Sequence, residues 1–206
     1  MYQSFNGNLY TINNSASPLT ERLPLLNQYP ILLRLIHWIT VVMIIALLVL
    51  GFWMTDRAGA NLWDELTNTL YSWHKLIGFL VLLVTAMRIV VKLLNKRPDY
   101  PSSISTGQIQ LAHVVQSAMY LLLVLVPLFG WAGVTAYPAL ITVGGLHLPA
   151  LPGVPKGEPL AKQLFEIHGY LVLALIAVAI AHIGAGLNHL WIKKDQVFDR
   201  IWFKSK

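Results

Sequence analysis

The sequence has 206 residues, of which 56% are hydrophobic and 12% are charged, whereas a soluble domain carries about 25% charged residues. It contains no cysteine, which excludes disulfides, thiolate metal sites and haem attached through thioethers. The formal net charge is +6, but the basic residues lie between long uncharged stretches. Membrane topology explains that pattern without nucleic acid binding.

The uncharged stretches predict membrane-spanning helices. Residues 35–55, 101–155 and 167–192 contain no Asp, Glu, Lys or Arg, and each run exceeds the roughly 20 residues that cross a bilayer as helix. A fourth apolar span starts at Tyr71 and carries three basic residues. We therefore predict four transmembrane helices, near 31–54, 71–94, 109–134 and 166–192.

The remaining segments are predicted to be tails and loops. Residues 1–29 form a polar tail that does not resemble a cleaved signal peptide, so the first span is expected to be a retained signal anchor. The segment 137–159 is too rich in Pro and Gly for a fifth span. We predict an all-α fold, in which residues 30–200 form one up-down four-helix bundle and residues 201–206 form a second short tail.

The distribution of charge predicts the orientation. The side of the membrane that holds residues 1–34, 88–99 and 193–206 has eleven basic residues against four acidic ones, and the opposite side has four against five. The positive-inside rule then places both termini in the cytoplasm, with the second and fourth helices running inward from the outer side.

Six of the seven histidines lie in or at the ends of the spans, and an ionisable residue inside a membrane helix suggests a function. His168 and His182 are fourteen residues apart, nearly four turns and roughly 21 Å along one helix face. His74 lies at the depth of His168. His37, with His113 as a further candidate, lies at the depth of His182. The spacing thus predicts an outer and an inner layer of imidazoles.

Two layers of facing imidazoles are typical of two haems in a bundle core. Arg34 lies on the same helix face as His37, and Arg88 lies fourteen residues after His74, so each is a candidate partner for a haem propionate. Their alternative roles are an ordinary positive-inside residue for Arg34 and snorkelling for Arg88. Glycines near the histidines would either leave room for haem or permit close helix contact. They are Gly51, Gly78, Gly130, Gly133, Gly169, Gly184 and Gly186.

Two other classes of protein, a structural zinc protein and a proton-coupled transporter, fit the sequence less well. A structural zinc site needs four ligands at one point, whereas these histidines fall in two separated layers. A proton-coupled transporter would be expected to carry a carboxylate or a broken helix at mid-membrane, and no predicted span has Asp or Glu at that depth.

Four motifs in order resemble the bacterial cytochrome b561 family over about residues 30–200. They are "RLIHWIT", "WHKLIGFLVLLVTAMRIVVKL", "LAHVVQSAMYLLLVLVPLFGW" and "IHGYLVLALIAVAIAHIGAGLNHLWIKKD". The resemblance implies an inner-membrane protein with two b-type haems in a four-helix bundle. It implies His74 and His168 as the outer iron ligands and His37 and His182 as the inner ones. His113 and His189 also fall at motif positions, and the resemblance implies that they line the inner haem or a quinone site.

One branch of that family is superoxide oxidase, so the resemblance implies electron transfer from superoxide to ubiquinone as a candidate activity. A positively charged entrance on the outer side would attract the superoxide anion. Lys75 and Lys162 are the candidates for it, although the outer charges are otherwise balanced. His147 and Glu166 are outer candidates for proton exchange. The alternatives are a cytochrome b anchor for a dehydrogenase or hydrogenase partner, and a haem-free membrane transporter.

Overall fold

The structure is a computed structural model that describes residues 28–96, 100, 104–195 and 197–203. Four of its helices are long and apolar enough to cross a membrane, which confirms the predicted all-α class. They are α1 (Ile31–Gly59), α2 (Glu65–Leu94), α3 (Thr106–Ala136) and α4 (Glu158–Leu187). The predicted tail segments 1–27 and 204–206 lie outside the described residues.

Two of the helices, α2 and α3, begin before the predicted apolar spans, at polar capping residues. The Asp64 carboxylate accepts a hydrogen bond from the Thr67 backbone N–H at 3.0 Å and starts α2. Ser105 and Gln108 form a capping box at the start of α3. Capping side chains satisfy the first backbone N–H groups of a helix, and hydropathy alone does not reveal them.

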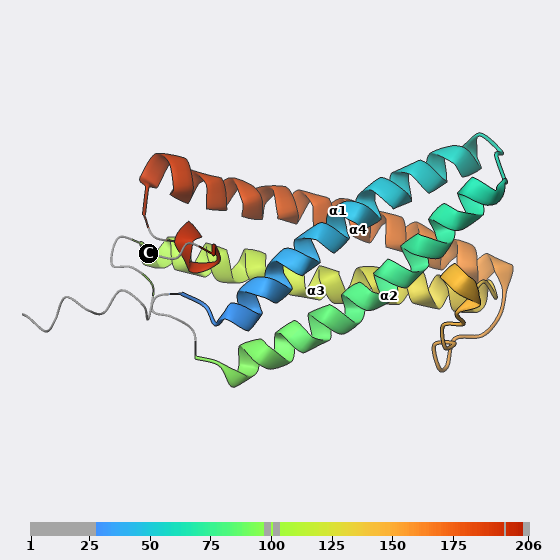
Figure 1. Cartoon of the computed structure of the whole chain (residues 1–206), viewed down its shortest axis with the longest axis horizontal. Helices are drawn as coiled ribbons and strands as arrows, with labels where there is room; N and C mark the ends of the chain where they lie inside the picture. Colours follow the sequence, from blue (N-terminus) through green and yellow to red (C-terminus); the bar gives the residue numbers. More distant parts are fainter. Residues whose placement is uncertain (1–27, 97–99, 101–103, 196, 204–206) are drawn as a thin grey trace, which may run out of the picture.

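The four helices pack in chain order, with α1 against α2, α2 against α3 and α3 against α4 (Figure 1). Within the described part of the chain, α1 and α4 do not pack closely against each other. The central core consists of five apolar residues: Val81, Leu122, Leu123, Val126 and Leu175. Apolar side chains such as Val42 and Ile180, each 66% exposed, face outward, as expected for contact with lipid.

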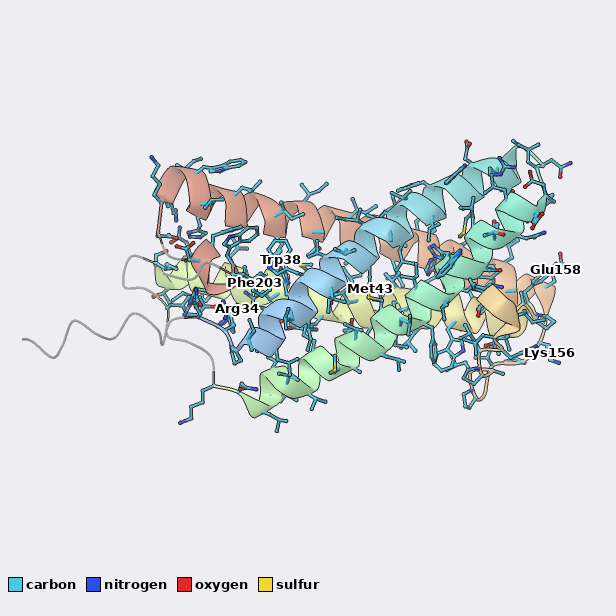
Figure 2. The ribbon with its side chains drawn as sticks, viewed as in Figure 1. Arg34, Trp38, Met43, Lys156, Glu158 and Phe203 are labelled. Atoms are coloured by element: carbon cyan, nitrogen blue, oxygen red, sulfur yellow. The ribbon has the colours of Figure 1, made fainter. Side chains whose placement is uncertain are left out.

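At the end of the bundle that the charge distribution predicts to face outward, called the outer end below, the loop between α3 and α4 folds back onto the bundle. It contains a short 3₁₀ helix, η3 (Val143–Gly145), and an isolated bridge between Ile141 and His147. Lys75 of α2 donates hydrogen bonds to the backbone carbonyls of Ala139, at 2.9 Å, and of Ile141. Lys156 and Glu158 lie at this end, far from Arg34 and Phe203 (Figure 2). The outer loop is thus anchored to the membrane helices.

At the opposite end, which is predicted to face the cytoplasm and is called the inner end below, the C-terminal segment covers the start of α1. After α4 the chain continues as a π-helix, η4 (Asn188–Lys193), and then as a short 3₁₀ helix, η5 (Phe198–Arg200). The indole N–H of Trp38 donates to the Ile201 carbonyl at 3.1 Å, and Arg34 donates to the Trp202 carbonyl at 2.9 Å. Arg34, Trp38 and Phe203 gather at this end (Figure 2). Residues 201–203 of the predicted tail are therefore held against the bundle.

Candidate functional site

The outer end of the bundle contains a pair of facing imidazoles. His74 on α2 and His168 on α4 have ring centres 6.2 Å apart, with their planes nearly perpendicular. His168 Nδ1 lies 2.8 Å from the Val126 carbonyl of α3. Since a carbonyl only accepts, Nδ1 carries the proton and Nε2 keeps a free lone pair. The structure thus brings together the two residues predicted for the outer layer.

Two glycines make room for these rings. A Cβ on Gly51 would lie 3.2 Å from Cε1 of His74, and a Cβ on Gly130 would lie 3.1 Å from the ring of His168. Gly133 serves helix contact, because its Cβ would collide with the ring of Phe165. Of the glycines predicted to leave space, Gly51 and Gly130 therefore lie directly against the histidines.

A cavity of about 470 Å³ adjoins the outer pair. His74 and His168 contribute to its wall, and the rest is mainly apolar, with Leu47, Val81 and Tyr170 among the lining residues. The buried Nδ1 of His74 has no hydrogen-bond partner among the described residues. A mainly apolar cavity with a few polar groups is typical of a cofactor site.

The inner end contains a second pair. His37 on α1 and His182 on α4 have ring centres 6.3 Å apart. Arg88 of α2 lies with its Nη2 atom 3.0 Å from Nδ1 of His37, and its guanidinium also contacts the ring of Tyr120. Because a guanidinium only donates, Nδ1 of His37 is the acceptor in this arrangement. Of the two candidates left open by the sequence, His37 and not His113 faces His182.

Arg34 and Arg88, the arginines predicted as propionate partners, each have one side-chain N–H near the inner pair that meets no acceptor among the described residues. Arg34 donates through Nη1 to the Gln28 side chain and to the Trp202 carbonyl, both at 2.9 Å. Its Nε atom, like that of Arg88, is buried without a hydrogen-bond partner among the described residues. Buried donors without partners are costly, and a bound anion would satisfy them.

The other predicted site residues belong to neither imidazole pair. His113 is exposed on α3, with its ring 5.8 Å from that of Tyr100. His189 is largely buried in η4 and contacts Asp195. The Lys75 ammonium is bound to loop carbonyls. His147 and Glu166 are both exposed, the first in the outer loop and the second at the rim of the cavity.

The geometry of each pair suits two axial ligands of one metal. An imidazole nitrogen binds a transition metal at about 2.0 Å and lies roughly 1 Å from its ring centre, so rings on opposite sides of one ion have centres about 6 Å apart. Both pairs match this separation. No group of three or more potential metal ligands occurs in the described part of the chain, so a site built from side chains alone would lack ligands.

The comparison with known proteins agrees with this geometry. Residues 28–204 match the family model described as prokaryotic cytochrome b561. The chain belongs to the prokaryotic cytochrome b561 family. It is also 25% identical over 179 residues to "Cytochrome b561 homolog 2" of Escherichia coli (strain K12), covering 86% of this chain and 93% of that protein. Members of this family are membrane cytochromes that bind b-type haem, which implies electron transfer.

At the outer pair, the hydrogen bond of His168 is compatible with ligation of a haem iron through Nε2. A metal-bound histidine usually donates its other N–H to a carbonyl or carboxylate, as His168 does to Val126. At the inner pair, ligation through Nε2 of His37 requires the proton on Nδ1, so Arg88 would have to leave Nδ1. The freed Arg88 guanidinium would then be available to donate a hydrogen bond to a haem propionate.

Three contributors to these ends were not predicted from the sequence. Val126 contributes a backbone carbonyl. Trp38 and Asp195 contact segments that lie beside them only in the folded chain. The spacing of His189 and Asp195 gives a weak signal, because six residues do not place two side chains on one helix face. Only the turn after η4 brings them together.

Proposed function

We propose that this protein holds two b-type haems and transfers electrons between the two sides of the bacterial inner membrane, with both termini in the cytoplasm. His74 and His168 would hold the outer haem, and His37 and His182 the inner one. The observation that supports this proposal most strongly is the pair of cross-helix imidazoles at each end, with ring centres at 6.2 and 6.3 Å.

When bound, haem supplies an iron that cycles between its ferric and ferrous states, and the protein determines its potential and orientation. The side chains of this chain have three tasks. The four histidines would bind the haem irons, and the Val126 carbonyl orients His168. Arg34 and Arg88, whose buried Nε–H groups have no partner among the described residues, would bind the propionates of the inner haem. The apolar core around Val81 and Leu122 excludes water between the two ends.

We infer a one-electron donor at the outer end, with superoxide as the first candidate, and ubiquinone as the acceptor at the inner end. The cavity beside His74 and His168 offers access at the outer side. Lys75 keeps its positive charge on that side, but two loop carbonyls already bind its ammonium, so its donors are engaged within the protein. On the inner side, His189 is the better candidate for proton delivery, since it is held by Asp195 whereas His113 is exposed.

The test is a reduced-minus-oxidised spectrum with haem stoichiometry, measured on the purified wild type and on three variants. His168→Ala should remove the outer haem alone, and His182→Ala the inner haem alone. The control, His147→Ala, should retain both, because His147 lies exposed in the outer loop. Survival of both haems in His168→Ala would overturn the assignment of ligands. Superoxide and quinone assays on the wild type then test the two substrates.

A further inference from the structure

The chain reverses its direction shortly after α4. Residues Asn188–Lys193 form the π-helix η4, and short π-helical turns occur frequently at functional sites. Lys194 follows in the left-handed conformation, with φ 51° and ψ 34°. This reversal turns the chain back, so that Asp195 contacts His189 although six positions separate them.

The Asp195 carboxylate is held at both of its oxygens. Oδ1 accepts a hydrogen bond from the Val197 backbone N–H at 3.1 Å, and Oδ2 lies 2.6 Å from Nδ1 of His189. The two side chains are only 13% and 15% exposed, respectively. A carboxylate accepts and does not donate, so the proton of this contact lies on Nδ1. His189 is therefore fixed as the Nδ1–H tautomer when neutral, and its Nε2 is free to take or give a proton.

We propose that Asp195 is the positioning residue of an inner proton donor, acting through His189 on a quinone head group. This inference deepens the proposed function and rests on it, because it assumes a quinone as the electron acceptor. Reduction of a quinone to a quinol takes up two electrons and two protons. In the proposed function, the one-electron donor supplies the electrons. Protonated His189 gives its Nε2 proton to a quinone oxygen, the O–H bond forms, and the ring returns to the Nδ1–H tautomer. Water on the cytoplasmic side then returns the proton to Nε2 for the second transfer.

The contact with Val197 predicts what an amide at position 195 would do. In D195N, the amide oxygen would accept the Val197 N–H, which leaves the NH₂ group facing Nδ1 of His189. An NH₂ group donates and does not accept, so the ring proton is driven to Nε2. D195N should thus invert the tautomer while preserving the size and shape of the side chain. D195E restores a carboxylate and should recover the original tautomer in part.

The experiment uses the full-length holoprotein in lipid nanodiscs, labelled with ¹⁵N-histidine and held in the reduced state. The His189 signals are assigned by their loss in H189Q. The wild type should show the Nδ1–H tautomer and D195N the Nε2–H tautomer. The control D199N makes the same chemical change four residues along the chain, and the Asp199 side chain makes no hydrogen bond in the described structure. D199N should leave the His189 signals unchanged.

The second readout is the rate of quinone reduction by the pre-reduced protein, with a short-chain ubiquinone as the probe. We expect kcat to fall about 10- to 100-fold in D195N, the range that loss of an orienting partner produces at metal-bound histidines, and to recover partly in D195E. The haem spectra of D195N should equal those of the wild type. An unchanged tautomer in D195N would overturn the positioning role. An inverted tautomer with an unchanged quinone rate would overturn the role in proton delivery.

Failure of the proposed function has a different signature. A wild-type protein that contains both haems but does not reduce the probe quinone would refute the quinone acceptor, and the proton-delivery role with it. The tautomer of His189 would still be measurable in that protein. The two failures are thus separated by the wild-type assay alone.

Discussion

His168 on α4 and Val126 on α3 are joined by a hydrogen bond of 2.8 Å between the ring Nδ1 and the backbone carbonyl. The bond fixes the imidazole tautomer, so that Nε2 faces away from α3 with a free lone pair. Gly130, one turn after Val126, leaves the space that the ring occupies. A backbone carbonyl cannot be removed by substitution, so Gly130 is the position through which the arrangement can be tested.

Gly130→Ala should weaken the outer haem site. The new Cβ would lie 3.1 Å from both Cε1 and Nδ1 of His168, so the ring must shift and its bond to Val126 must lengthen. Loss of a partner that orients a ligand typically costs about 10- to 100-fold in metal affinity. Haem titration of the purified apoprotein measures the effect. Gly107→Ala is the matched control on the same helix, since its Cβ would meet nothing within 4 Å, and equal affinities in the two variants would contradict the prediction.

Arg88→Gln should lower the midpoint potential of the inner haem. The Arg88 guanidinium lies 3.0 Å from Nδ1 of His37, and a nearby positive charge favours the ferrous state. Removing one charge at a distance of several ångströms in a low-dielectric site changes the potential by an amount on the order of tens of millivolts. Redox titration followed optically measures both haems. The outer haem should keep its potential, and a shift confined to the outer haem would refute the proximity of Arg88 to the inner one.

The sequence predicted the two histidine layers well because helical periodicity places residues fourteen apart on one face. It paired His74 with His168 on depth alone, and the structure shows those rings facing each other. It left His37 and His113 open as partners of His182, because depth does not reveal which way a helix faces. Contacts made by the backbone, such as the carbonyls that bind Lys75, have no sequence signal at all. The role of Lys75 in anchoring the loop therefore became visible only in the structure.

Trp38→Phe should loosen the C-terminal segment from the inner end. The substitution keeps an aromatic ring but removes the indole N–H that donates to the Ile201 carbonyl at 3.1 Å. A hydrogen bond of this kind contributes about 0.5 to 1.5 kcal/mol. Arg200 is only 5% exposed, so trypsin can cleave after it only when the segment opens. Cleavage after Arg200 should accelerate in the variant, whereas cleavage after the exposed Lys194 provides the internal control and should not change.

Lys75→Met should release the outer loop. The Lys75 ammonium donates to the carbonyls of Ala139 and Ile141, and a hydrogen bond to a charged group contributes about 1.5 to 3 kcal/mol. Hydrogen exchange of the loop amides, such as the Leu148 N–H that donates to Leu140, should become faster. Lys162→Met removes an exposed lysine from the same side and should leave exchange unchanged. If Lys75 acts chiefly by attracting an anionic donor, its loss would slow electron entry without altering exchange.

Asp64→Asn should remove a pH-dependent contribution to the stability of the hairpin between α1 and α2. The Thr67 backbone N–H, and then the Arg57 guanidinium, lower the pKa of the Asp64 carboxyl from 3.8 to about 2. Since the folded state holds the ionised form more strongly, the contribution is complete well above pH 3.8 and is lost as the pH falls towards 2. Asparagine still caps a helix, so the variant isolates the contribution of the charge.

Thermal unfolding in detergent, followed by circular dichroism, measures this contribution. The unfolding midpoint of the wild type should exceed that of Asp64→Asn at neutral pH, and the difference should shrink steadily below about pH 4. Asp56→Asn is the matched control, because the Asp56 side chain makes no hydrogen bond or ion pair in the described structure. Its midpoint should follow that of the wild type at every pH. A difference between wild type and Asp64→Asn that persists unchanged to pH 2 would show that the ionised carboxylate does not stabilise the hairpin.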